Sequence, residues 1–225
     1  MKEIILNMTY LSAAFLSLFG FAEILFYKTR LRVEHTRKLV HFGTGLLTLL
    51  FPLYLTSHRQ VLLLCGSFLG ILVLSQKFDL LKSINAVDRK TYGSILFPVI
   101  VYGSYVASFV FNDLQLFYLP ILILSISDPL AALVGKKYPF GKYVFLGHTK
   151  TWMGSTAFFV SSFLISILAF KLSPSMYSLN SLTMAALVAS VACIAEGLSK
   201  NGYDNFSIPV AVMSTLYVFK ISNLC

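Results

Sequence analysis

The sequence predicts an all-α, polytopic transmembrane helix bundle with about eight spans and no soluble domain. Three observations predict it: long apolar runs without charge, basic residues that gather in every second link between those runs, and the overall composition. Hydrophobic residues make up 57% of the 225 residues and charged residues only 12%. Soluble domains carry about a quarter charged residues, so this composition excludes an ordinary soluble protein.

Four stretches lack charge over the length that a helix needs to cross a bilayer, about 20 residues. They are residues 4–22, 39–57, 91–112 and 151–170. Shorter or polar-interrupted runs complete the set. Residues 1–225 are therefore expected to form a single transmembrane domain, with spans at about residues 4–27, 39–57, 60–76, 91–112, 114–135, 151–170, 179–195 and 205–220.

The basic residues predict the orientation of the bundle. Of the 18 lysines and arginines, 14 fall in the links after the first, third, fifth and seventh spans, and only Lys2, Arg59, Lys171 and Lys220 fall on the other side. The positive-inside rule makes the rich side cytoplasmic, which places both termini outside. The same asymmetry explains the net charge of +9, so the charge does not indicate a nucleic-acid partner.

Four acidic residues stand out because they lie inside or against the apolar runs. Glu23 lies in the inner third of the first span, Asp128 lies deep in the fifth, and Glu196 and Asp204 flank the link between the last two spans. An ionisable group at such depth costs roughly 2.5–3.5 kcal/mol, so it usually faces a polar cavity. All four are expected at the same, cytoplasmic depth. The alternative is that they are ion-pair partners of nearby lysines and arginines.

A basic pattern opens the second span. Arg37, Lys38 and His41 are helical neighbours at spacings of three and four residues, so all three can converge on one anion. Basic residues at an inner helix end also occur for topology alone. The pattern Arg89-Lys90-Thr91-Tyr92-Gly93 forms a similar basic, hydroxyl-bearing entrance to the fourth span.

Two further patterns suit a polar ligand at the membrane surface. In Ser127-Asp128-Pro129, the proline is expected to break the span just after the acid, which frees backbone groups for a polar cavity or ligand. The segment from Gly147 to Ser155 offers Lys150, hydroxyl groups and glycines at an expected helix start, a combination that suits phosphate.

The acids near the carboxyl end suggest a metal ion. Glu196, Asp204 and Asn205 lie beside a last span expected to be broken by Pro209, and oxygen ligands of this kind hold divalent cations.

Taken in order, these motifs resemble the CTP-dependent lipid kinases, which include dolichol kinase, phytol kinase and fungal CTP-dependent diacylglycerol kinase. The resemblance runs from Arg37 to Pro209 through Arg-Lys-x-x-His-x-x-x-Gly, basic-x-Tyr-Gly, Ser-Asp-Pro-x-Ala-x-x-x-Gly, Lys-Thr-x-x-Gly-Ser and Glu…Asp-Asn-x-x-x-Pro. One departure is Trp152-Met153, where many members carry an acid before the glycine.

The resemblance implies a membrane enzyme that phosphorylates a lipid-soluble alcohol such as an isoprenoid or a diacylglycerol, with CTP as donor and Mg²⁺ as cofactor. The phosphate-binding candidates are Arg37, Lys38, Gly135, Lys136, Lys150, Thr151 and Ser155. Asp128, with Glu196 or Asp204, would hold Mg²⁺, and a carboxylate such as Asp128, or else His41, would accept the hydroxyl proton. The alternatives are a cytidylyltransferase that makes a CDP-lipid and a transporter for a phosphorylated solute.

Overall fold

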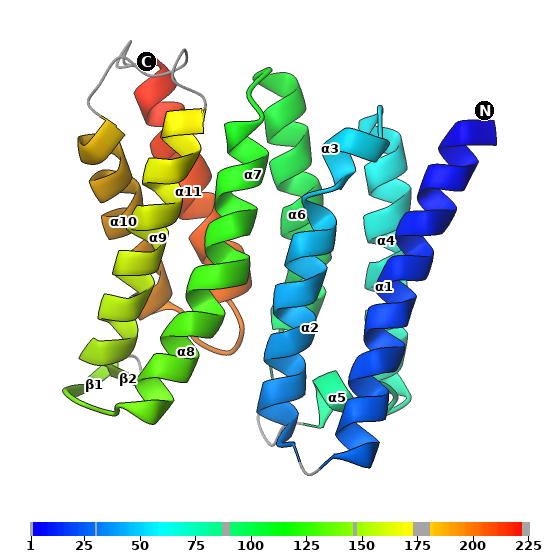
Figure 1. Ribbon diagram of the computed structural model, residues 1–225, viewed down its shortest axis with the longest axis horizontal. Helices are drawn as coiled ribbons and strands as arrows, with labels where there is room; N and C mark the ends of the chain where they lie inside the picture. Colours follow the sequence, from blue (N-terminus) through cyan, green and yellow to red (C-terminus); the bar gives the residue numbers. More distant parts are fainter. Residues whose placement is uncertain (1, 30, 87–90, 146–147, 173–180, 222–225) are drawn as a thin grey trace.

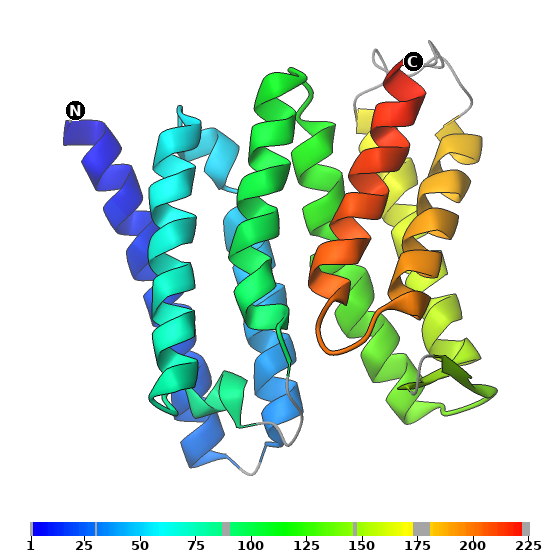
Figure 2. The same ribbon diagram turned by 180° about the vertical axis from the view of Figure 1, so that it is seen from behind.

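The structure is a computed structural model that describes residues 2–29, 31–86, 91–145, 148–172 and 181–221. In chain order its elements are α1 (Lys2–Lys28), α2 (Val33–Thr48), α3 (Phe51–Tyr54), α4 (His58–Lys77), α5 (Lys82–Asn85), α6 (Gly93–Val110), α7 (Gln115–Leu122), the π-helix η1 (Ile123–Ser127), α8 (Asp128–Lys137), β1 (Lys142–Phe145), β2 (His148–Thr151), α9 (Trp152–Leu172), α10 (Ser181–Leu198) and α11 (Asp204–Ile221). The long helices stand side by side in both views (Figures 1 and 2).

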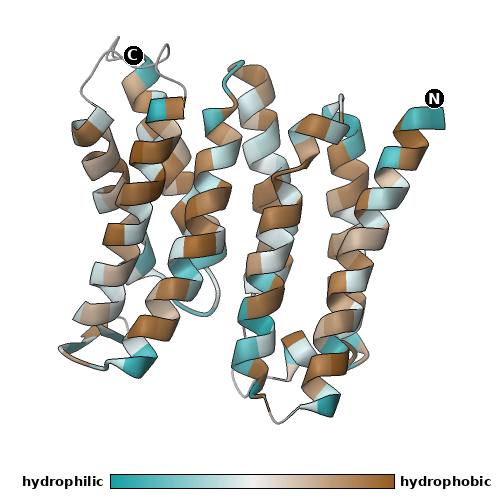
Figure 3. Cartoon of the chain, in the orientation of Figure 1, coloured by the Kyte–Doolittle hydropathy of each residue, from teal (hydrophilic) through white to brown (hydrophobic). Residues whose placement is uncertain are grey.

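The described residues form a membrane helix bundle without a separate soluble domain, as the sequence predicts. Among the described residues, six helices are long and apolar enough to cross a membrane: α1, α4, α6, the continuous rod Gln115–Lys137, α9 and α10. The helices α2 and α11 lie alongside them, but α2 has only 16 residues and carries charges in its first turns. Hydrophobic residues dominate the middle of the helices in Figure 3. Because α2 and α11 are not among the six helices named above, the count of about eight spans stays a prediction.

The start of α1 and the end of α11 lie at the same end of the bundle, as an even number of spans requires (Figure 1). The opposite end carries α5 and the strands β1 and β2. Helix ends there carry basic residues, among them Lys28 on α1, Lys77 on α4 and Lys137 on α8. We call this the basic end. Its location on the cytoplasmic side stays a prediction.

Pro129 does not break the fifth span. The rod continues from Gln115 to Lys137, and the irregularity lies before the acid, where residues 123–127 form one π-helical turn. Proline lacks an N–H group, so the carbonyl oxygen one turn earlier loses its hydrogen-bond donor. A wider, π-helical turn accommodates the missing hydrogen bond without ending the helix. Pro209 also lies inside a continuous helix, α11. The two breaks expected from these prolines are therefore wrong.

The segment before α9 is an antiparallel hairpin that leads directly into the helix start that the sequence predicts. Lys142 pairs with Thr151 and Tyr143 pairs with Lys150. Aromatic and β-branched residues favour this extended conformation. Gly141 begins the hairpin with a φ of +64°, and α9 starts directly after it, at Trp152. Gly147 lies outside the described residues.

Glu23 has a structural partner at the basic end. Its Oε1 accepts a hydrogen bond of 2.8 Å from the backbone N–H of Ser83 in α5. The residue before α5, Leu81, has a left-handed conformation and offers no side-chain cap. A carboxylate at a helix start satisfies donors that the helix itself leaves free. Glu23 therefore holds α5 against α1, and it does not line the cavity described below.

Candidate functional site

A cavity of about 210 Å³ lies between the helices at the basic end and continues toward the middle of the bundle. Its outer part, which we call the mouth, is polar. The mouth is lined by Arg37, Lys38, His41, Thr91, Asp128, Thr149, Lys150, Ser199, Lys200, Asp204 and Asn205. Its inner part is apolar and is lined by side chains of α1, α2, α3, α4 and α6. One cavity thus joins a basic polar surface to an apolar interior.

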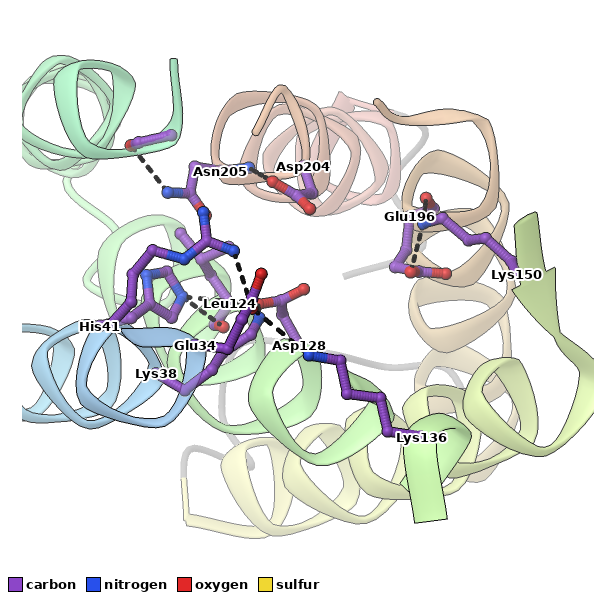
Figure 4. A network of polar contacts seen from close by, with 12 residues as sticks. Glu34, Lys38, His41, Leu124, Asp128, Lys136, Lys150, Glu196, Asp204 and Asn205 are labelled. Atoms are coloured by element: carbon purple, nitrogen blue, oxygen red, sulfur yellow. Dashed lines mark hydrogen bonds and ion pairs between the residues drawn. The ribbon is translucent and has the colours of Figure 1, made fainter. Parts of the chain in front are cut away.

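Lys38 and Asp128 form the central ion pair of the mouth. Lys38 on α2 donates a hydrogen bond to Asp128 Oδ2 on α8, although the two residues are 90 positions apart. The side chain of Asp128 is only 8% exposed and that of Lys38 is 19% exposed. A buried carboxylate needs such a partner because its desolvation costs several kcal/mol. Lys38 therefore joins the basic pattern of α2 to Asp128 (Figure 4).

The π-helix and His41 complete the wall around Asp128. In a π-helical register, the donor for the Leu124 carbonyl would be the N–H of Pro129, which proline lacks. His41 Nε2 lies 3.2 Å from this carbonyl oxygen and, as a donor, satisfies it. His41 Nε2 is also 3.9 Å from Asp128 Oδ2, and its ring meets Phe97 edge to face with centroids 5.6 Å apart. His41 thus holds the wall that carries Asp128.

Lys150 enters the mouth from the other side. It lies on β2, and its ammonium group donates to the carboxylate of Glu196 and to the backbone carbonyl of the same residue on α10. Glu196 is 7% exposed, and its Oε2 has no hydrogen-bond partner within the described part of the chain. Figure 4 shows this pair across an open space from Lys38 and Asp128.

The third wall of the mouth is the loop between α10 and α11, which is tied to the start of α6. The side-chain amide of Asn205 donates to the carbonyl oxygen of Gly93 at 2.7 Å, and Tyr92 N–H donates to Asn201 at 2.8 Å. Gly202 has a φ of +86°, and a Cβ there would lie 2.4 Å from the nitrogen of Gly93. Only glycine fits this approach, which brings Asp204 to the mouth.

The arginine beside Lys38 is also held in place. Arg37 is paired at 3.3 Å with Glu34, one turn earlier on α2. Glu34 also pairs with Lys136 at 3.4 Å. The Lys136 side chain is 62% exposed and does not line the cavity. Arg37 is therefore at the mouth, whereas Lys136 supports it only through the shared glutamate.

Three other predicted phosphate-binding residues have structural contacts away from the cavity lining. A Cβ at Gly135 would lie 2.7 Å from Thr151 Oγ1 and 3.3 Å from the Cα of Gly154, so this glycine lets α8 and α9 approach closely. Thr151 Oγ1 accepts from Gly154 N–H at the start of α9, at 3.1 Å. Ser155 Oγ lies 2.8 Å from the hydroxyl of Tyr143. Arg89 and Lys90 lie outside the described residues.

The acids expected to bind metal divide between two places. Asp128 and Asp204 line the cavity, whereas Glu196 faces Lys150 beside it. Across the described residues, no group of three or more His, Cys, Asp or Glu side chains is close enough to hold a metal ion. Two carboxylates still suit Mg²⁺, which commonly takes one or two protein ligands together with substrate phosphates.

Residues that sequence reasoning did not single out for the site also line this cavity. Lys200 and Ser199 lie at the mouth, and four phenylalanines, Phe15, Phe19, Phe51 and Phe68, line the interior. Lys200 lies between Glu196 and Asp204 in the sequence, and this position could have identified it as a candidate site residue. The phenylalanines carry no such signal, because an apolar run looks alike whether its residues face lipid or a cavity.

Fold and site together define a multi-pass membrane protein with a basic pocket that opens into an apolar interior. The chain is 31% identical to a phytol kinase of Synechocystis sp. over 208 residues, covering 90% of this chain and 84% of that protein. It is also 35% identical over 119 residues to a probable chloroplastic phytol kinase of rice, Oryza sativa subsp. japonica, covering 47% of this chain and 38% of that protein. No family model matches the chain, and no solved structure matches it.

The chain therefore belongs to the phytol kinase family and is a membrane lipid kinase. The rice relative matches over a shorter segment and agrees with this assignment.

Proposed function

We propose that the protein transfers the terminal phosphoryl group of CTP to the hydroxyl of an isoprenoid alcohol dissolved in the membrane. The single observation that carries the proposal is the continuous cavity, with cations at its mouth and aromatic rings inside. Both relatives are named for the phosphorylation of phytol, an alcohol of this kind. CTP as donor rests on the resemblance of the motifs to CTP-dependent lipid kinases.

Phosphoryl transfer requires charge neutralisation and alignment more than covalent help from the protein. Arg37, Lys38, Lys150 and Lys200 surround the mouth and would neutralise the triphosphate. A phosphate that approaches Lys150 competes with Glu196 for the same ammonium group. The triphosphate would thus occupy the space between the Lys38–Asp128 pair and the Lys150–Glu196 pair.

Asp128 is the proposed proton acceptor. It lies on the α2 side of the mouth, beside Lys38 and His41, and the next turn of α2 places Thr44 in the apolar part of the same cavity. The carboxylate of Asp128 takes the hydroxyl proton while the alcohol oxygen bonds to the γ-phosphorus. The bond from that phosphorus to the bridging oxygen breaks, and CDP leaves with the electron pair.

Mg²⁺ is the proposed cofactor. Asp204, together with Asp128 and the phosphate oxygens, would hold it, and the ion would neutralise the charge on the transferred group and on the leaving diphosphate. His41 is proposed as a positioning residue, because its Nε2 engages the Leu124 carbonyl in the turn just before Asp128.

The test is a product analysis with purified protein in lipid nanodiscs, phytol and CTP labelled at the γ-phosphate. A lipid kinase yields labelled phytyl phosphate and CDP, and the Asp128→Asn variant should yield neither. Release of pyrophosphate with formation of a CDP-lipid would instead identify a cytidylyltransferase. Uptake of a phosphorylated solute into vesicles without any product would identify a transporter. A parallel reaction with ATP decides the choice of nucleotide.

A further inference from the structure

The inner part of the cavity is lined mainly by apolar side chains, and the hydroxyl groups of its two threonines are paired. Its two threonines turn their hydroxyl groups away to their own helix: Thr44 Oγ1 donates to Val40 at 2.7 Å and Thr48 Oγ1 donates to Thr44 at 2.7 Å. Each threonine therefore has its hydrogen bond satisfied within α2. A cavity whose polar atoms are already paired holds an apolar occupant better than water.

From its mouth to its far end, the cavity is about as deep as one leaflet of a bilayer. Lys38 lies at the mouth and Thr48 lies at the far end of the same helix, so the lining of α2 spans about 15 Å at 1.5 Å per residue. The hydrocarbon core of a bilayer is about 30 Å thick, so half of it is about 15 Å. An alcohol with its hydroxyl at the mouth would therefore extend its chain to about the middle of the membrane.

The far end of the cavity has a floor of three aromatic rings. Phe15 of α1 packs against Phe68 of α4 with centroids 4.9 Å apart and against Phe51 of α3 with centroids 6.0 Å apart. All three side chains belong to residues that are at most 7% exposed. The short helix α3 turns from the end of α2 toward α4 (Figure 1), and Phe51, its first residue, lines the cavity.

The floor is anchored from α6. The hydroxyl of Tyr105 donates to the carbonyl oxygen of Leu55, the residue that ends α3, at 2.9 Å. Helix α1 packs mainly on α2, and α4 packs mainly on α6, while α1 and α4 share few contacts. The three rings are thus a bridge between two helix pairs, with the apolar cavity on the side of the bridge that faces the mouth.

From this geometry we infer that the inner cavity binds the hydrocarbon chain of the alcohol and that Phe15, Phe51 and Phe68 limit the length of the chain. The inference rests on the proposed function, and it adds a specificity determinant to it. Chains that end before the floor lie wholly inside the protein. Longer polyprenols must bend out between the helices or leave the hydroxyl short of Asp128, so they are poorer substrates.

The first experiment measures kcat/KM for geraniol, farnesol, geranylgeraniol, phytol and solanesol in nanodiscs. Filling the cavity near its floor with Cys65→Phe should lower the value for geranylgeraniol and phytol by about tenfold or more and leave geraniol unchanged. Opening the floor with Phe51→Ala should raise the value for solanesol relative to phytol. The matched controls, Leu63→Phe and Phe21→Ala, change exposed residues on α4 and α1 and should keep the wild-type profile.

The second experiment does not require turnover. A geranylgeraniol analogue with a diazirine at its tail end is irradiated with the Asp128→Asn variant, and the labelled residues are located by tandem mass spectrometry. Labelling at Phe15, Phe51 or Phe68 supports the inference, and phytol should compete with it. Labelling confined to lipid-facing positions such as Phe21 and Leu63 overturns it.

The two failures are distinguishable. If the wild-type protein phosphorylates alcohols and the chain-length profile is the same in Cys65→Phe and Phe51→Ala, the inference is wrong and the proposed function stands. If the wild-type protein phosphorylates no alcohol, the proposed function is wrong, and the crosslinking experiment alone decides whether an alcohol chain binds in the cavity.

Discussion

Lys38 on α2 and Asp128 on α8 form a largely buried ion pair at the point where the π-helical turn ends. The pair joins the basic pattern of the second predicted span to the acid of the fifth. Lys38 and Asp128, on two helices that are distant in the chain, thus line one cavity together with Lys150 and Asp204.

Asp128→Asn should abolish turnover while the protein stays folded in the membrane. The amide keeps the shape of the side chain but neither accepts the proton nor offers a charged ligand, so the rate should fall at least about a hundredfold. The measurement is kcat with CTP and phytol. Asp79→Asn is the control, because the side chain of Asp79 is 78% exposed at the same end of the bundle. Near-normal activity in Asp128→Asn would reduce Asp128 to an ion-pair partner.

Arg37→Lys should raise the KM for CTP or lower kcat, although it preserves the positive charge. Arginine offers a planar fork to phosphate and lysine a point charge, so a residue that serves only topology tolerates the exchange. The control is Arg32→Lys at the exposed start of the same helix. Wild-type kinetic constants in Arg37→Lys, measured on purified protein, would assign Arg37 to topology alone.

Glu196→Gln should lower the stability of the protein by about 3 kcal/mol, because it leaves the Lys150 ammonium without its charged partner in a largely buried site. Thermal unfolding in detergent measures the loss. The double variant Glu196→Gln, Lys150→Met should recover stability but not kinase activity. The pair of Lys136 and Glu34 is the contrast, because the Lys136 side chain is 62% exposed, and Lys136→Met should cost less than about 1 kcal/mol. Full activity in the double variant would exclude Lys150 from phosphate binding.

Gly45→Ala should disrupt the contact between α2 and the π-helix. A Cβ at Gly45 would lie 1.7 Å from Ser125 Oγ and 2.4 Å from Ser125 Cβ, and the second of these atoms cannot move without the backbone. Overpacking of this kind typically costs about 1–3 kcal/mol. Ser125→Gly should restore part of the loss in the double variant. Gly70→Ala on α4, where no atom lies within 4 Å, should be neutral or slightly stabilising. Equal stability of both alanine variants would contradict the close approach.

The orientation can be tested by cysteine labelling from outside the cell, after serine replaces the native cysteines. A cysteine at the exposed Asn112 should react with an impermeant maleimide, and one at the exposed Lys142 should not. The expectation rests on the unequal distribution of basic residues and the positive-inside rule. The reverse labelling would place the mouth of the cavity outside, where no cytoplasmic nucleotide reaches it.

Much of the fold could be predicted from the sequence because its causes are local. The lengths of the charge-free runs and the positions of the basic residues predict a membrane helix bundle. Asp128 is recognisable as a candidate site residue because a carboxylate inside an apolar run is energetically costly and usually has a function. The breaks predicted at the prolines were wrong, because other groups in the bundle can replace the backbone hydrogen bond that a proline removes. Just before Asp128, a π-helical turn and a hydrogen bond from His41 replace it.

The sequence by itself determined the class of the protein and the order of its motifs, since these depend on composition and spacing along one chain. Only the tertiary structure decided that Lys150 pairs with Glu196, that Asp128 pairs with Lys38, and that Glu23 caps α5. It also decided that Phe15, Phe51 and Phe68 meet at the end of one cavity. These contacts join helices that are distant in the chain, and the rotation of each helix about its axis selects them. An apolar run carries little record of that rotation, because lipid and protein interior accept the same side chains.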